Sequence, residues 1–455
     1  MRESSRSIRT ALAALVALIA MALTVSACGG SDSSSSSSSG GTAKAGTAKA
    51  GTKIVYWASN QGATIQQDDE VINKAAAAFK TKTGIVVEHK VIPWSDLFTN
   101  ITTATTSGKG PDVLNIGNTW SASLQATGAF LPFEGKDLEA IGGKDKFVQT
   151  SLSASGAPGK TITSVPLYGL SYGLFYNKKL FKDANLEPPK TWSEFVAAAK
   201  KLTVPSKDQW GMVIEGASIS EGAHFAFILG RQNGGKLFAG TKPTFDSAPI
   251  VKGVTDYVNI VGKDKIANPS NAQYGDGTKS SEQFAKGKTG MLIQQNNGEN
   301  NLKSNGMKKS EYGIAEVPVE DGSSTPIMTH VAGINISIFS NTKQKDAALQ
   351  WVKFLTSPEE QVTLNQSFGS LPVVTAAQSN PAFQTANLKT FNGILADHAE
   401  PMPLIPEEGQ METFIGTALK DLVAKAATKG AVSDADVKAA LKDANDKMVA
   451  AAGSG

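Results

Sequence analysis

Cysteine is almost absent from this chain of 455 residues, since Cys28 is the only one. A single thiol cannot form an intramolecular disulfide, and it cannot build a metal site from several cysteines. The sequence therefore excludes a disulfide-rich scaffold and a cysteine-based metal centre. We expect no cofactor and no bound metal, and we expect packing alone to stabilise the folded part.

Arginine is also scarce beyond the N-terminus, where Arg231 is the only one after Arg9. Arginine is the side chain best suited to bidentate binding of carboxylates and phosphates. Its scarcity argues against a strongly anionic ligand, although lysines and helix N-termini can also bind anions. Basic runs with interleaved aromatic residues are missing too, so nucleic acid is not an expected partner.

The apolar stretch Ala11–Val25 is only 15 residues long and follows a segment with three arginines. It is short for a membrane-spanning helix and has the length of a signal-peptide core. Small residues precede Cys28, and this arrangement resembles the bacterial lipobox, in which the cysteine thiol receives a diacylglyceryl group. We therefore expect residues 1–27 to be a signal peptide and Cys28 to be a lipid anchor on the outer face of the cell membrane. The alternative is ordinary secretion with an incidental cysteine.

Residues 28–51 contain a serine tract and two copies of Thr-Ala-Lys-Ala-Gly. Such a segment has little to bury, and we expect a flexible tether with ends roughly 25 Å apart. About 400 residues follow, enough for two or three cores. The hydrophobic content of 40% is ordinary for a globular protein. We expect a short flexible tail at residues 449–455.

Strands and helices alternate after the tether. The first part is predicted to contain a strand at 53–58, a helix at 66–82, a strand at 85–91, a helix from 95 to 108 and a strand at 112–116. This alternation favours parallel strands with right-handed crossovers. Later strands are predicted at 174–177, 211–215, 291–294, 312–317 and 333–338, and later helices at 191–202, 221–230, 346–356, 359–366, 411–425 and 434–451. The pattern predicts an α/β protein with more than one sheet.

A set of short motifs carries a resemblance to a known family. They are Pro111-Asp112-Val113, the segment Thr127–Phe133, Val165-Pro166, the segment Phe175–Phe181, Pro189–Trp192, Phe284–Lys288, the segment Ala347–Gln361 and Gly369–Pro372. In this order they resemble the family 1 extracellular solute-binding proteins of bacterial ABC importers, in their sugar-binding, lipoprotein form. The resemblance spans nearly everything from Lys53 to the C-terminus.

The resemblance implies a two-lobed periplasmic-binding-protein-like fold of type II, with mostly parallel sheets and a ligand cleft between lobes joined by hinge crossings. Lobe one would comprise residues 52–165 and 296–355, and lobe two residues 166–295 and 356–448. The implied function is a monomeric, extracytoplasmic receptor. It would bind a neutral sugar or oligosaccharide by closure of the lobes and deliver it to the permease subunits of an ABC transporter.

Polar and aromatic residues follow the predicted strands, where open parallel sheets bind their ligands. A sugar offers an apolar face that stacks on an aromatic ring and hydroxyls that pair with planar polar groups. By this reasoning and by the resemblance, the candidate ligand-binding residues are Ser59, Asn60, Gln61, Asn118, Thr119, Trp120, Tyr168, Ser171, Glu221, His224, Phe225, Asn296, Asn297 and His330. Met411 and Glu412 are further candidates on the far rim.

Several of these assignments have alternatives. Trp120 is either a stacking platform or a core tryptophan, and His224 either faces the cleft or forms hydrogen bonds at the start of its helix. Asn296 and Asn297 stand where related proteins often carry an aromatic residue. This departure leaves the identity of the ligand open.

Two alternative functions are a hydrolase and a receptor for a solute other than a sugar. Gly169-Leu170-Ser171-Tyr172-Gly173 matches the G-x-S-x-G pattern of lipid-anchored or secreted hydrolases. That motif requires a strand before the serine and a helix after it, whereas a strand is predicted after Ser171. A hydrolase could also use a pair of carboxylates distant in sequence. The remaining alternative is the same fold with a non-sugar solute, such as a polyamine, a peptide or a phosphate ester.

Overall fold

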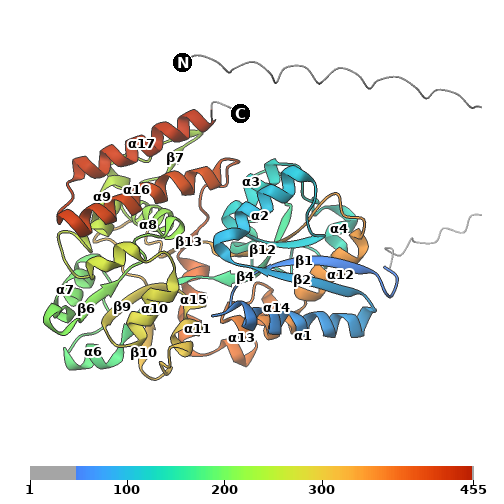
Figure 1. Cartoon of the computed structure of the whole chain (residues 1–455), viewed down its shortest axis with the longest axis horizontal. Helices are drawn as coiled ribbons and strands as arrows, with labels where there is room; N and C mark the ends of the chain where they lie inside the picture. The colour runs from blue at the N-terminus through green and yellow to red at the C-terminus, as the bar shows by residue number, and fades with distance from the viewer. Residues whose placement is uncertain (1–47, 453–455) are drawn as a thin grey trace, which may run out of the picture. The chain divides into compact units, whose positions relative to one another are not determined.

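The computed structural model describes residues 48–452, all of which belong to one unit, 45–455. The predicted signal peptide, Cys28 and nearly all of the predicted tether lie outside the described residues. Within them, two mixed sheets are each covered by helices on both faces (Figure 1). The prediction of an α/β protein with more than one sheet is confirmed.

The first sheet has the strand order β2-β1-β3-β12-β4. Its strands are β1 (Lys53–Ser59), β2 (Val86–Ile92), β3 (Val113–Gly117), β4 (Ser164–Leu170) and β12 (Ala332–Ile338). β1 pairs in parallel with β2 and with β3, as the alternation of strands and helices predicts. β12 arrives from far along the chain and runs antiparallel to both of its neighbours.

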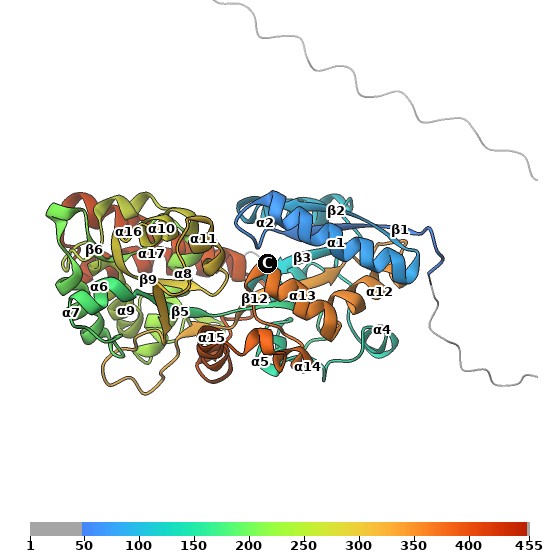
Figure 2. The same cartoon turned by 90° about the horizontal axis from the view of Figure 1, so that it is seen from below.

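The strands of this sheet send alternate side chains to opposite faces. Tyr56 in β1 packs in a core with helices α1 (Ile65–Thr83), α12 (Lys345–Leu355) and α13 (Pro358–Phe368). Trp57 borders a second core on the other face, with α2 (Trp94–Ser107), the 3-10 turn η1 (Asn118–Trp120) and α3 (Ser121–Ala126). Figure 2 shows these helices around the strands.

The second sheet has the order β10-β5-β9-β6. Its strands are β5 (Tyr172–Asn177), β6 (Trp210–Val213), β9 (Thr289–Gln295) and β10 (Tyr312–Ala315). β5 pairs antiparallel with β9 and β10, and only β6 and β9 are parallel. The expectation of mostly parallel sheets is therefore wrong in this detail. The reason is that β4 runs directly into β5, so that the chain enters the second sheet without a crossover helix.

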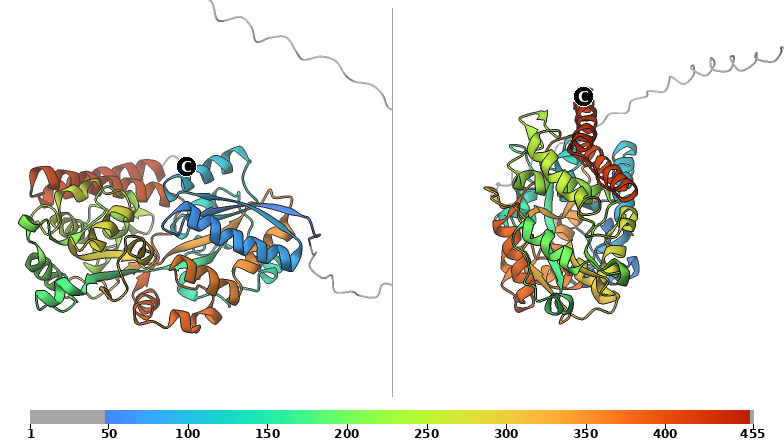
Figure 3. Two further views of the ribbon diagram at one scale, coloured as in Figure 1. Left: turned by 60° about the horizontal axis from the view of Figure 1, so that its bottom comes forward. Right: turned by 90° about the vertical axis from the view of Figure 1, so that its left-hand side faces the viewer.

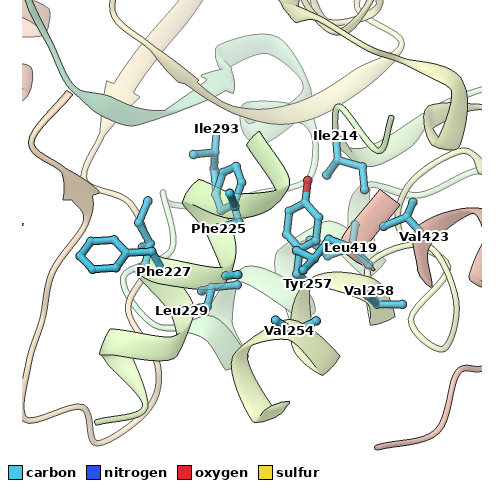
Figure 4. Packing of buried hydrophobic residues seen from close by; sticks show 14 of the residues in the cluster. Ile214, Phe225, Phe227, Leu229, Val254, Tyr257, Val258, Ile293, Leu419 and Val423 are labelled. Carbon is cyan, nitrogen blue, oxygen red and sulfur yellow. The ribbon is translucent and has the colours of Figure 1, made fainter. Parts of the chain in front are cut away.

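Helices cover both faces of the second sheet. One face carries α7 (Trp192–Leu202), α8 (Ile219–Gln232), α9 (Ala248–Asn259), α16 (Glu408–Lys429) and α17 (Asp434–Ala452). The other face carries α10 (Gly277–Ala285), α11 (Gly298–Ser304) and α15 (Ala386–Asp397). Figure 3 shows α16 and α17, in red, beside the green helices of this half, and Figure 4 shows the packing of α8, α9 and α16 side chains.

Short elements complete the described chain. They are α4 (Gly135–Ala140), α5 (Gln149–Leu152), α6 (Lys178–Asp183), α14 (Thr375–Gln378), β7 (Phe238–Ala239), β8 (Lys242–Pro243), β11 (Thr329–His330) and β13 (Ala399–Glu400). The 3-10 turns are η2 (Pro205–Lys207), η3 (Pro269–Gln273) and η4 (Pro381–Phe383). β11 and β13 form a small parallel ladder of their own.

Local signals place several helix ends. Thr191 and Glu194 form the reciprocal capping box that starts α7, each side chain accepting a hydrogen bond from the other residue's backbone N–H. Gly84 ends α1 in the left-handed conformation with φ of 75°, which glycine adopts at little steric cost. The sequence patterns at both places predict these ends correctly.

Several segments differ from the predicted organisation. β10 lies within predicted lobe one but pairs with β5 in the second sheet, and α11, also within predicted lobe one, packs on that sheet through Leu302. α13 lies within predicted lobe two but packs in the core of the first sheet through Leu364 and Phe368. The predicted flexible tail begins inside α17, which extends to Ala452 because Met448 still packs in the core.

Candidate functional site

The segments that connect the two sheets are held together by hydrogen bonds. The backbone N–H of Ser171, between β4 and β5, donates to Oδ1 of Asn296 at 2.8 Å. Nδ2 of Asn296 donates in turn to the carbonyl of Gly369 at 2.7 Å. Ser171 and Asn296 are both fully buried. Their polar atoms brace this junction, and contact of either residue with a solute stays a prediction.

Ser171 also lacks the setting of a catalytic serine. A strand, β5, follows it directly, and its hydroxyl donates to the carbonyl of Tyr172 at 3.2 Å. A nucleophile elbow needs a helix after the serine and an exposed hydroxyl. The hydrolase interpretation built on Ser171 therefore loses its structural basis.

Tyr168 and Phe225 are core residues. The ring of Tyr168 packs edge-on against Phe368, with centroids 5.3 Å apart, and the residue is 1% exposed. Phe225 stacks on Tyr257 at 5.0 Å within the helical core shown in Figure 4. The sequence analysis assigned both to the ligand site because they stand near the start of a strand or a helix, yet packing accounts for both.

The residues after β1 form a local hydrogen-bonded turn. Nε2 of Gln61 donates to Oγ of Ser59 at 3.1 Å. Oδ1 of Asn60 accepts from the backbone N–H of Trp94 at 2.7 Å, which fixes the start of α2. Ser59 and Gln61 are buried, whereas Asn60 is half-buried. Asn297, which precedes α11, is also half-buried, and its contact with a solute stays a prediction.

The residues after β3 contact the rest of the molecule closely. Nδ2 of Asn118 donates to the carbonyl of Val331 at 2.7 Å, which ties η1 to the connection between β11 and β12. Trp120 is 6% exposed and stacks on Trp94, with ring centroids 4.6 Å apart and planes 19° apart. Of the two interpretations of Trp120, the structure favours the core tryptophan.

Other predicted residues converge in a polar cluster at the start of α16, close to α8, β5 and β11. We call Tyr172, Glu221, His224, His330, Glu408 and Glu412 the histidine–glutamate cluster. The hydroxyl of Tyr172 donates to Oε1 of Glu221 at 2.7 Å and lies 2.9 Å from Nδ1 of His224. The rings of His224 and His330 stack with centroids 4.0 Å apart.

The cluster contains two ion pairs, both at His224, whose Nδ1 lies 3.8 Å from Oε1 of Glu221. Nε2 of His224 lies 3.5 Å from Oε1 of Glu412. Burial alone would lower the pKa of His224, but the two neighbouring glutamates, Glu221 and Glu412, outweigh it and raise the pKa to about 9. Burial alone would raise the pKa of Glu412, but His224 outweighs it and lowers the pKa. Burial, followed by the charge of His224, holds the pKa of His330 well below its usual range, so this second imidazole is neutral.

Glu408 differs from its neighbours because it has no partner. It is fully buried, and neither of its carboxyl oxygens forms a hydrogen bond. Oε1 of Glu412, which contacts His224 at 3.5 Å, and Nδ1 of His330 form no hydrogen bond either. Burial, and then the charge of Glu412, raise the pKa of Glu408 well above its usual range. An unpaired buried polar group costs about 1–3 kcal/mol, so this arrangement is a local cost to stability.

The cluster contacts elements of both sheets. Thr119 follows β3 of the first sheet, and its side chain is near enough to Glu408 and Glu412 to oppose a rise in either pKa. α16 packs against η1 and α3. A Cβ atom at Gly409 would lie 3.0 Å from the ring of Phe98 in α2, so the backbone approaches closely here. The cluster therefore lies where the two halves meet, beyond the end of β3.

Sequence reasoning found part of this cluster. It predicted Glu221, His224 and His330, and it named Glu412 as a further candidate beside Met411, which is a core residue. It missed Glu408. The available signal was the pair of glutamates four residues apart on an otherwise apolar helix face, at positions 408 and 412.

A small cavity of about 10 Å³ lies in the second half between α8, α9 and β6, lined mainly by apolar side chains with Glu215 and Glu221 at its edge. It has room for about one water molecule. Within residues 48–452, no group of three or more His, Cys, Asp or Glu is placed to hold a metal ion. None of the helices described there is long and apolar enough to cross a bilayer.

Comparison with known proteins identifies the fold and the family. Residues 62–362 match the family model described as bacterial extracellular solute-binding protein. The diacetylchitobiose binding protein of Streptomyces coelicolor is 25% identical over 88% of this chain and 90% of its own length. The sn-glycerol-3-phosphate-binding periplasmic protein of Brucella abortus is 26% identical over 72% of this chain and 76% of its own.

Solved structures show the same two-lobed fold. An ABC transporter solute-binding protein from Thermotoga lettingae, bound with α-D-tagatose, superposes with a TM-score of 0.77 and 21% identity, covering 87% of this chain and all of that one. The likeness confirms the two-lobed periplasmic-binding-protein-like fold, and the family match extends over most of the described residues. The chain belongs to the bacterial extracellular solute-binding proteins, the receptors that serve ABC transporters.

Proposed function

We propose that this protein is a lipid-anchored receptor that binds a sugar or oligosaccharide between its two lobes and delivers it to an ABC-transporter permease. The observation that supports this most is the histidine–glutamate cluster, in which buried acceptors without partners lie at the junction of the two halves. Hydroxyl groups of a sugar are donors that such acceptors can pair with.

The mechanism needs binding and no chemical reaction. A solute that contacts Thr119 on one side and Glu412 on the other gains contacts only when the lobes are closed, so it shifts the population toward the closed form. Relatives of this chain are named for a chitobiose derivative and for glycerol 3-phosphate. The side chain of the single arginine in residues 48–452, Arg231, is bound to Glu400, which supports a sugar over a phosphate ester.

A thermal-shift screen tests the sugar receptor. We expect at least one mono- or oligosaccharide to raise the melting temperature of the purified protein, because a ligand that binds only the folded state adds stability by mass action. The shift should disappear in His224→Ala, which removes the cation that pairs with Glu412, and persist in Asp421→Asn, an exposed position on the same helix. A protein that responds to no sugar at millimolar concentration would contradict the proposal.

The lipid anchor is tested separately, since Cys28 lies outside the described residues. Cys28→Ser should move the protein from the membrane fraction to the culture medium or the periplasm, because a lipidated cysteine is the only anchor that the sequence predicts. Cell fractionation and immunoblotting measure the distribution. Unchanged retention in the membrane would count against lipidation, and sugar binding by the variant would show that the receptor itself is intact.

A further inference from the structure

Carboxyl groups outnumber positively charged groups in the histidine–glutamate cluster. Three glutamates, Glu221, Glu408 and Glu412, lie around a single charged imidazole, His224. Glu215 adds a fourth carboxyl group behind Glu221. No lysine or arginine in the described part of the chain forms an ion pair with any of the four. The site therefore has room for a further positive charge.

Glu408 and Glu412 are the members of the cluster whose carboxyl oxygens lack hydrogen bonds. They are four residues apart on α16, so both side chains lie on the same helix face, where like charges disfavour each other. Both oxygens of Glu408 and Oε1 of Glu412 are buried and accept no hydrogen bond, although Oε1 of Glu412 contacts His224. The start of α16 does not account for this, because neither oxygen of Glu408 accepts a hydrogen bond from the helix's free backbone N–H groups.

The unpaired atoms match one particular chemical group. An ammonium group has three N–H donors. Glu408 offers two carboxyl oxygens without hydrogen bonds, and Oε1 of Glu412 accepts no hydrogen bond and contacts only His224, at 3.5 Å. Nδ1 of His330 is also buried and unpaired, and it can accept a hydrogen bond when the proton of the neutral ring is on Nε2. This fourth acceptor is left for a neighbouring hydroxyl.

We infer that the solute bound by this receptor is an amino sugar whose protonated amine lies against Glu408 and Glu412, with an adjacent hydroxyl at His330. The inference rests on the proposed function and replaces the neutral sugar expected from the sequence. A polyamine shares the ammonium group, but it has no hydroxyl to pair with His330.

Binding of the amine is coupled to protons. The ammonium arrives charged, so Glu408 must give up its proton to pair with it, and that proton goes to the buffer. The groups that face Glu408 are Glu412 on its own helix, Thr119 from η1, and, beyond Glu412, His224 with Glu221 from α8, His330 from β11 and Tyr172 from β5. Only His224 among them is cationic, and it is already paired with Glu412. Affinity for the amine should thus rise with pH until the amine itself deprotonates.

The test is calorimetry on the full-length protein with glucosamine and chitobiose, their N-acetylated forms, glucose and putrescine. The amine forms should bind at least tenfold more tightly than the N-acetylated forms at pH 6.5, where the amine of glucosamine is almost fully protonated. Buffers with different ionisation enthalpies should show release of about one proton. Glu408→Gln should abolish both the preference and the proton release, whereas Asp421→Asn, at an exposed position, should keep both.

The outcomes separate the inference from the proposed function. Equal or tighter binding of N-acetylated or neutral sugars overturns the inference and leaves the sugar receptor intact. Binding of putrescine without any sugar overturns the sugar receptor and the amino sugar together. Retention of the amine preference in a folded Glu408→Gln protein, with an unchanged melting temperature, also overturns the inference.

Discussion

Replacing Trp120 with alanine is expected to lower the free energy of unfolding by about 3–5 kcal/mol, the usual cost of removing a large aromatic side chain from a core. The indole stacks on Trp94 and packs against Phe98 at 4.9 Å, in a core that also contains Leu97 and Leu114. Urea unfolding monitored by circular dichroism measures the loss. The expected effect reverses the view of this residue as a platform whose removal would leave stability unchanged.

Two variants serve as controls. Trp120→Phe keeps an aromatic ring against Trp94 and should lose less stability than the alanine variant. Trp210→Ala removes a half-buried tryptophan at the edge of the second sheet, and its cost should be smaller because less surface returns to water. If Trp120→Ala unfolds at the same urea concentration as the parent protein but no longer binds sugar, then Trp120 is a platform after all.

The protein is expected to lose several kcal/mol of stability between pH 5 and pH 9, in the absence of solute, because buried groups bind protons more tightly in the folded state. Burial is the main cause that raises the pKa of Asp68 to about 6, of Glu320 to about 7 and of Glu215 to about 8. His224, with a pKa of about 9, acts in the same direction through its glutamate neighbours.

The sign follows from the proton count. Each of these groups has a folded pKa above its unfolded value, so its contribution is fully present below the unfolded pKa and is lost as the pH rises through the folded pKa. Glu412 acts in the opposite direction, because its pKa is lowered and its contribution is present at pH values above its unfolded pKa. His330 also acts in the opposite direction, because burial holds its pKa well below its usual range and its contribution grows as the pH rises to about 6.5. Lys146, with a pKa lowered by burial to about 8, opposes the loss only above that pH. Maximum stability is thus expected at mildly acidic pH.

Urea unfolding at pH 5, 7 and 9 measures this dependence. Glu215→Gln should flatten the profile, because the amide can still accept a hydrogen bond from Ser280 but does not titrate. Asp421→Asn, at an exposed position, should leave the profile unchanged. A stability that rises from pH 5 to pH 9 would show that the carboxyl groups are ionised in the folded protein.

The sequence predicts local structure well and long-range pairing poorly. Periodicity and capping residues locate α1, α7 and the parallel trio of β1, β2 and β3, because these depend on neighbours along the chain. The direction of β12 depends on strands that lie far away in sequence. The sheet to which β10 belongs also depends on a partner, β5, more than a hundred residues earlier, and no local pattern encodes it.

The candidate site shows the same division. Trp120 follows a predicted strand and Tyr168 lies at a predicted hinge crossing, and an aromatic side chain at either place fits a ligand site and a core equally well until packing is known. Glu408 was not predicted because its burial and its lack of hydrogen bonds depend on tertiary packing. In sequence, a buried glutamate without a hydrogen bond cannot be distinguished from a solvated one. The resemblance to a family predicted the fold correctly, although it could not predict which cleft residues this chain uses.

The hydrogen bonds of Arg231 determine which side chains move as one rigid group. Its guanidinium holds Glu400 through two hydrogen bonds of 2.8 Å, and Glu400 pairs with His330 in the ladder of β11 and β13. Arg231 and His224 lie on the same helix, so the two stacked imidazoles belong to one rigid group made of α8, β11 and β13. Thr119 does not belong to that group. If the lobes open as proposed, the distance between labels on α8 and β13 should therefore stay constant, whereas the distance between labels on η1 and α16 should change.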